Sequence, residues 1–156
     1  MNDRYLYRAK RTDNGKWVEG NLIHAKKDYY ICENPYECMN EYSSLNGQSY
    51  GFGGFKFVDP STICQCTGLK DKNGKLIWEN DICDRKEKYP EIVKYHDGDW
   101  TLDYSYASNR EIGFNCCNLG FYVTERNCVE VIGNIFDNPE LLEVGCGQEL
   151  DWGEEK

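Results

Sequence analysis

Residues 63–79 read ICQCTGLKDKNGKLIWE, with alternating and β-branched residues on both sides of Asn73-Gly74. Asn-Gly is the strongest short-range signal for a β-hairpin, because both central residues of a type I′ turn need a positive φ. The stretch therefore predicts an antiparallel hairpin that pairs about 63–70 with 75–79.

Two further turns of the same kind lie before and after that hairpin, and each joins runs with strand patterning. We therefore expect three hairpins in all. The other two turns are Asp13-Asn14-Gly15, between about 4–11 and 16–23, and Asp97-Gly98, between about 91–96 and 100–104.

The rest of the chain carries weaker signals. Short strands are expected at 121–123 and 129–135. Asn138-Pro139-Glu140 predicts the start of one short helix, because it offers a capping residue, a proline at the first helical position and a carboxylate near the positive end of the helix dipole. The stretch 34–57 is expected to be irregular.

Composition agrees with a small β protein. The chain has 156 residues, which suits one ordinary domain, and 12 of them are Tyr, a residue that favours strands. The second half also has the strand, long loop, strand, turn, strand order of small barrels. The predicted fold class is mainly β: a small N-terminal β unit, then an SH3-like small β-barrel with one short C-terminal helix.

Charge is distributed unevenly along the chain. The formal net charge is −9, opposite in sign to that of general phosphate-binding proteins. Residues 1–31 hold seven basic and four acidic residues, whereas 125–156 hold two basic and nine acidic ones. Such polarity favours head-to-tail self-association or a basic partner, and it is also compatible with two merely solvated faces.

Nine cysteines, an odd number, cannot all pair within one chain. No signal peptide and no apolar run of membrane-span length is found, so we expect free thiols, a cytoplasmic location and no membrane contact. The closest pairs, Cys64 with Cys66 and Cys116 with Cys117, do not have the spacing of zinc knuckles. We therefore expect no metal and no cofactor.

Catalytic signatures are also missing. His24 and His96 are the only histidines, and neither lies in a recognisable nucleophile or metal motif. The glycine-rich stretch 47–55 lacks the Gly-Lys-Ser/Thr ending of a phosphate-binding loop, so it is interpreted as a mobile loop or a subunit arm, with a base-stacking surface as the alternative. We expect no enzyme activity.

Three blocks of sequence resemble the YopX family of small phage and prophage proteins. They come in family order and span about 5–143. The first block is 8–20, which contains DNGKWVEG; the second is 58–82, which contains VDPSTI, TGLKDKNGK and ENDI; the third is 131–142, VIGNIFDNPELL. The resemblance implies a phage or prophage origin and a YopX-like domain over 1–144, followed by an acidic tail at 145–156. It divides that domain into an N-terminal unit over about 1–62, with an insertion at 34–57, and the barrel with its helix over about 63–144. It carries over no catalytic residue.

These observations lead to two functional hypotheses. The first is a non-enzymatic interaction module that forms a homo-oligomer and contacts an unidentified protein partner, because Tyr and Trp are favoured interface residues. The alternative is a nucleic-acid-binding or nucleic-acid-associated regulatory protein that uses the basic N-terminal face. Trp17 is expected in the core. The candidate binding surface comprises Arg4, Arg8, Lys10, Arg11, Tyr50 and Phe52.

Overall fold

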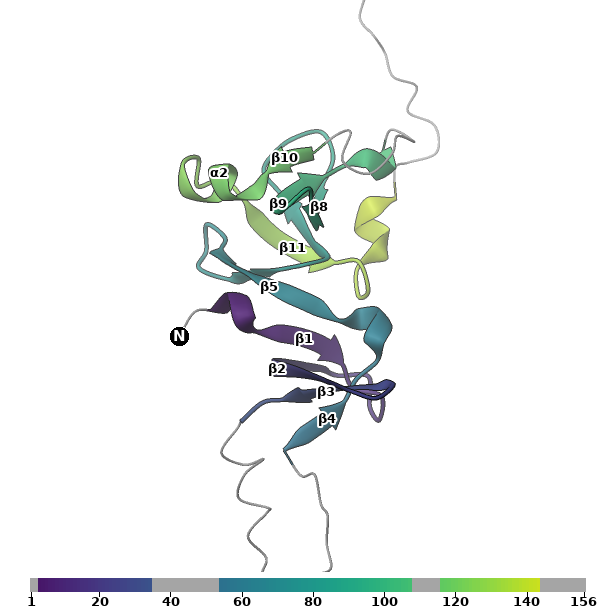
Figure 1. Cartoon of the computed structure of the whole chain (residues 1–156). Helices are drawn as coiled ribbons and strands as arrows, with labels where there is room; N and C mark the ends of the chain where they lie inside the picture. Colours follow the sequence, from purple (N-terminus) through teal and green to yellow (C-terminus); the bar gives the residue numbers. More distant parts are fainter. Residues whose placement is uncertain (1–2, 35–53, 108–115, 144–156) are drawn as a thin grey trace, which may run out of the picture.

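The computed structural model describes residues 3–34, 54–107 and 116–143. They form two antiparallel sheets, one above the other, and β5 is the strand of the first sheet that runs along the boundary with the second (Figure 1). The mainly β class is confirmed. The strands are β1 (Tyr7–Lys10), β2 (Trp17–Ala25), β3 (Asp28–Cys32), β4 (Phe55–Phe57), β5 (Cys64–Lys70), β6 (Leu76–Trp78), β7 (Asp81–Asp84), β8 (Glu91–His96), β9 (Asp99–Asp103), β10 (Cys116–Asn118) and β11 (Glu130–Asn134). The helical elements are α2 (Leu119–Thr124) and the 3₁₀ turns η1 (Asp3–Tyr5), η3 (Pro60–Thr62), η4 (Ser105–Ala107) and η5 (Pro139–Leu142).

All three predicted hairpins are confirmed. β1 pairs with β2, β5 with β6, and β8 with β9. Gly15, Gly74 and Gly98 have φ values of 69°, 82° and 84°. Of the residues that precede them, only Asp97 also has a positive φ, of 49°, so only the Asp97-Gly98 turn has the two positive φ values of a type I′ turn.

The first sheet has the strand order β4-β3-β2-β1-β5-β6 and bends so that the chain after β4 returns to β1. Val58 forms an antiparallel bridge with Arg11, and the backbone N of Asp59 donates to the carbonyl of Lys10 at 2.9 Å. This bend encloses a core to which β1, β2, β3 and the residue directly after β4 each contribute one buried side chain. The core residues are Ala9, Val18, Ile31 and Val58.

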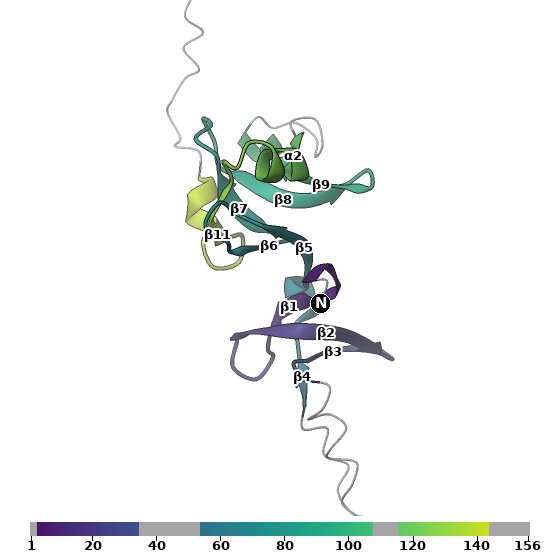
Figure 2. The ribbon, with the colours of Figure 1, turned by 90° about the vertical axis from the view of Figure 1, so that its left-hand side faces the viewer.

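The second sheet has the order β10-β9-β8-β7-β11, and α2 packs against β9 (Figure 2). Apolar side chains of the sheet and of α2 meet those of β6 in a second core. The buried members of this core are Ile77, Cys83, Val93, Leu102, Leu119, Val129 and Val131.

The predicted SH3-like barrel is not closed. Within the described residues, β10 and β11 remain the edges of the second sheet, because β5 pairs with β1 and so belongs to the first sheet. The β5–β6 turn still contacts the second sheet: the Asp71 carboxylate accepts a hydrogen bond from the backbone N of Val131 at 3.0 Å.

The prediction of a strand over 121–123 is wrong, because these residues belong to the helix α2. The side chain of Asn118 accepts a hydrogen bond from the backbone N of Phe121 at 2.7 Å and so caps the first turn. Alternation at three positions carries too little information to distinguish a strand from a helix of six residues.

The short helix expected at Asn138 is present as the 3₁₀ turn η5. The side chain of Asn138 does not cap η5; instead, it accepts a hydrogen bond from the backbone N of Asn134 at 3.2 Å. No helix in the described ranges is long and apolar enough to cross a membrane.

A third cluster of apolar residues joins the two sheets. Trp17, expected in the core, is half-buried here and meets the ring of Phe136 edge-on, with 5.8 Å between centroids. Cys64, Cys66 and Trp78 are the buried members of this cluster. We call this region the junction.

Candidate functional site

Arg8, a residue of the predicted basic face, is buried in the junction. Its Nη2 donates to the carboxylate of Asp81 on β7, and its guanidinium lies 4.8 Å and 5.3 Å from the ring centroids of Trp17 and Trp78. Burial raises the pKa of Asp81, although the charge of Arg8 acts in the opposite direction. Arg8 therefore joins the two sheets and does not present its charge on the surface.

Lys10 also contacts the second half of the chain. Its Nζ lies 2.5 Å from Oδ1 of Asp137, and Nε1 of Trp17 donates to Oδ2 of the same carboxylate at 2.6 Å. These donors lower the pKa of Asp137 to about 2. The charge of Lys10 is thus largely neutralised within the molecule.

The other members of the predicted surface are dispersed. Arg11 forms an ion pair with Asp13 in the turn after β1, and Arg4 donates to the hydroxyl of Tyr5 at 2.7 Å. Arg4, Arg8, Lys10 and Arg11 therefore do not gather into one unpaired basic face. Tyr50 and Phe52 lie outside the described residues.

The thiols of the junction have an unreactive environment. Burial raises the pKa of both Cys64 and Cys66, which keeps them protonated at neutral pH and makes them poor nucleophiles and metal ligands. In the described part of the chain, no three His, Cys, Asp or Glu residues form a group able to hold a metal ion.

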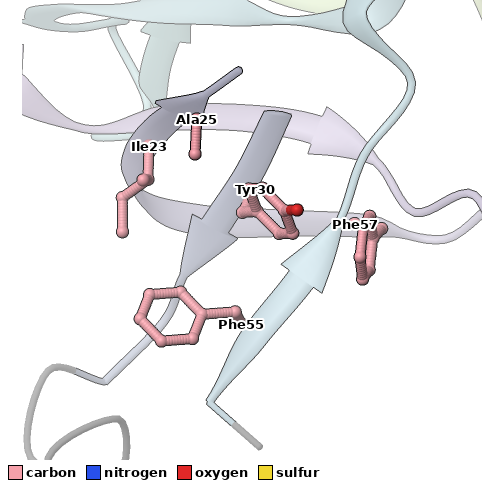
Figure 3. Close-up of a pocket in the computed structure, with 5 residues that line it drawn as sticks. All are labelled: Ile23, Ala25, Tyr30, Phe55 and Phe57. Atoms are coloured by element: carbon pink, nitrogen blue, oxygen red, sulfur yellow. The ribbon is translucent and has the colours of Figure 1, made fainter. Parts of the chain in front are cut away.

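An apolar hollow of about 280 Å³ lies on one face of β2, β3 and β4, in the part of the first sheet that lies away from the second sheet (Figures 1 and 3). Phe57 is 55% exposed and Ile23 is 36% exposed. We call this hollow the outer pocket. Its lining residues are Ile23, Ala25, Tyr30, Phe55 and Phe57.

Strand register explains why these side chains meet. Ile23 pairs with Tyr30, and Tyr30 pairs with Phe57, so the three side chains form a row across the sheet. The rings of Tyr30 and Phe57 are 4.4 Å apart between centroids. Ala25 and Phe55 lie two positions from members of this row and share its face, because side chains alternate along a strand.

The outer pocket is suited to an apolar side chain from another segment or molecule. Its walls are apolar and aromatic, and its volume is below the range typical of sites for drug-sized ligands. The turn after Ala25 carries Lys26 and Lys27, both exposed, so the pocket has a basic edge. Its chemistry favours an aromatic or aliphatic group accompanied by carboxylates.

Sequence reasoning did not identify the outer pocket. The alternation of Ile23 with Ala25, and of Phe55 with Phe57, was the available signal. That signal is incomplete without the register of β3, which brings the two pairs of residues together across Tyr30.

Comparison with known proteins found a sequence family and a solved structure that are similar to this chain. The sequence model of the YopX protein family matches residues 6–143, most of the chain. The chain belongs to the YopX family. A crystal structure of protein EF1440 from Enterococcus faecalis is similar to it, with 25% sequence identity and a TM-score of 0.47; the similarity covers 88% of this chain and 96% of that one. No curated protein matches the chain.

The YopX match covers both sheets and the outer pocket, and it ends before segment 144–156. The sequence blocks that carry the YopX resemblance meet at the junction. The first contributes Arg8 and Trp17, the second Asp81, and the third Phe136 and Asp137. These YopX positions therefore hold the two sheets together.

Proposed function

We propose that this YopX-family chain is a phage- or prophage-encoded, non-enzymatic interaction module that assembles with further copies of itself and contacts a protein partner. The observation that carries the proposal is the outer pocket, with its exposed aromatic and aliphatic lining. A cytoplasmic location is part of the proposal. It is supported by the free thiols of Cys32, Cys64, Cys66, Cys83, Cys117 and Cys128.

The exposure of Phe57 and Ile23 supports an interface role. Apolar residues grouped around a hollow lose contact with water when a partner covers them, and burial of each contributes about 1.5–3 kcal/mol. Aromatic side chains in pockets are also frequent centres of binding energy in interfaces.

The surroundings of the basic residues favour this proposal over nucleic-acid binding. Arg8, Lys10 and Arg11 each form an ion pair with a carboxylate of the same chain. A phosphate backbone would have to compete with these carboxylates for each cation.

The mass of the protein in solution tests the proposal. We expect the chain to form a species larger than a monomer as its concentration rises, measured by size-exclusion chromatography with light scattering. Phe57→Ser should shift this equilibrium towards monomer by about tenfold or more in concentration, because it removes apolar surface from the outer pocket.

Tyr95→Ser is the matched control, because Tyr95 is an aromatic residue of the second sheet and is 59% exposed. It should leave the assembly unchanged, and circular dichroism should show the same fold in all three proteins. Equal masses for the chain and Phe57→Ser would contradict the proposal. Salt-sensitive binding of DNA or RNA that Phe57→Ser leaves intact would instead favour the nucleic-acid hypothesis.

A further inference from the structure

The edge of the outer pocket restricts what can fill it. Lys26 and Lys27 form the turn between β2 and β3, directly after Ala25, and both are exposed. Two copies that packed outer pocket against outer pocket would bring no carboxylate to these lysines from the pocket lining, which is uncharged, so their desolvation would have an electrostatic cost. An occupant that combines large apolar side chains with carboxylates avoids this cost.

Residues 144–156, VGCGQELDWGEEK, have this combination. Leu150 and Trp152 are separated by one position, so in an extended conformation both side chains fall on the same side. Four carboxylates and one lysine accompany them, which makes the segment acidic. The carboxylates are Glu149, Asp151, Glu154 and Glu155.

We propose that the outer pocket binds segment 144–156 of a second copy of the chain, with Trp152 and Leu150 in the pocket and the neighbouring carboxylates facing Lys26 and Lys27. This inference rests on the proposed function and names the partner of the same site. An extended segment laid across β2, β3 and β4 buries its apolar side chains in the row formed by Ile23, Tyr30 and Phe57.

The geometry favours a second copy over the chain's own segment. Asp137 contacts Trp17 at the start of β2, whereas Ile23 and Ala25 lie at the other end of this strand. At about 3.3 Å per residue, Ala25 is up to about 26 Å from Trp17. After Asp137 the chain continues into η5, drawn in yellow, which lies beside the second sheet and not beside β2, β3 and β4 (Figure 1). Trp152 is only nine positions after Glu143, so within one chain the segment would have to run almost fully extended along the molecule.

Such contacts are head-to-tail, because the pocket of one copy receives a different part of the next. Heterologous contacts of this kind form rings when the rotation closes and open chains when it does not. The separation of basic and acidic residues along the sequence, noted above, fits this arrangement.

The test uses the chain without residues 144–156 and a fluorescent peptide of that segment with Cys146→Ser. We expect the shortened chain to be monomeric by light scattering and to bind the peptide, measured by fluorescence anisotropy. The peptide with Trp152→Ala and the shortened chain with Phe57→Ser should each weaken binding by about tenfold or more. Lys26→Glu with Lys27→Glu should also weaken binding, whereas Tyr95→Ser should have no effect.

The outcomes separate this inference from the proposed function. A shortened chain that still assembles, with assembly lost in Phe57→Ser, would overturn the inference and leave the proposed function standing. A full chain that is monomeric while the shortened chain binds the peptide would show docking within one chain, which also overturns the inference. Absence of both self-association and peptide binding would overturn both.

Discussion

At the scale of single residues, Asp137 shows how the junction uses a carboxylate. Lys10, Trp17 and Asn134 each direct a hydrogen-bond donor at it, and together they lower its pKa to about 2 from an ordinary value of 3.8. The unfolded chain therefore takes up a proton at a higher pH than the folded chain does. The contribution of Asp137 to stability is complete above about pH 4 and is lost as the pH falls from about 4 to 2.

We predict that Asp137→Asn reduces the pH dependence of stability in this window. The variant should be less stable than the unchanged chain at pH 6, and the difference should shrink towards pH 2, measured as urea midpoints across the range. Asp97→Asn removes an equal charge from a side chain that is 89% exposed, and it serves as the control. A constant difference between Asp137→Asn and the unchanged chain from pH 6 to pH 2 would show that the ionised carboxylate is not the cause.

At the scale of elements, the end of β11 depends on a glycine for close packing. A Cβ on Gly133 would lie 2.5 Å from Oδ1 and 2.9 Å from Cβ of Asn138. This contact follows a register shift between Val131 and Gly133, where β11 pairs with β7. The turn from β11 to η5 therefore requires a residue without a side chain at position 133.

Gly133→Ala should destabilise the fold by about 1–3 kcal/mol in urea unfolding, because it overpacks this turn. Asn138→Gly removes the three atoms nearest to the new Cβ, at the cost of the hydrogen bond from the backbone N of Asn134. The double variant should therefore be more stable than the sum of the two single effects implies. If the changes in unfolding free energy of the two single variants simply added, the destabilisation by Gly133→Ala would not come from the contact with Asn138.

At the scale of the whole molecule, the ion pair of Arg8 with Asp81 connects the two sheets. Asp81 is 1% exposed, and its carboxylate also accepts a hydrogen bond from the backbone N of Trp78 at 2.9 Å. Loss of either charge leaves the other buried without compensation. A broken buried pair typically costs about 3–5 kcal/mol.

We predict that Asp81→Leu and Arg8→Met each destabilise the chain by about that amount, and that the double variant is much less destabilised than the sum. Urea unfolding followed by tryptophan fluorescence and by circular dichroism measures this coupling. In each single variant, the unfolding curve followed by fluorescence should no longer coincide with the one followed by circular dichroism, because the two sheets lose a shared contact. Additive effects with coincident curves would contradict a connecting role.

The hairpin turns of this protein were determined by sequence alone. Turn residues select a hairpin through backbone φ, which depends on the residue itself, so three hairpins and the β class follow from Asn-Gly and Asp-Gly pairs. Asn80 is a further case: it has a φ of 65°, which Asn tolerates better than most residues other than glycine. The YopX membership is likewise readable from the sequence.

Only the tertiary structure decided which charges are buried and where the surface is apolar. Arg8 and Asp81 are 73 positions apart and Lys10 and Asp137 are 127 apart, so no local pattern reveals that these cations already have partners. The outer pocket likewise depends on strand register across β2, β3 and β4. Burial and pairing are properties of residues that meet in space, and the chain brings them together only when both sheets have formed.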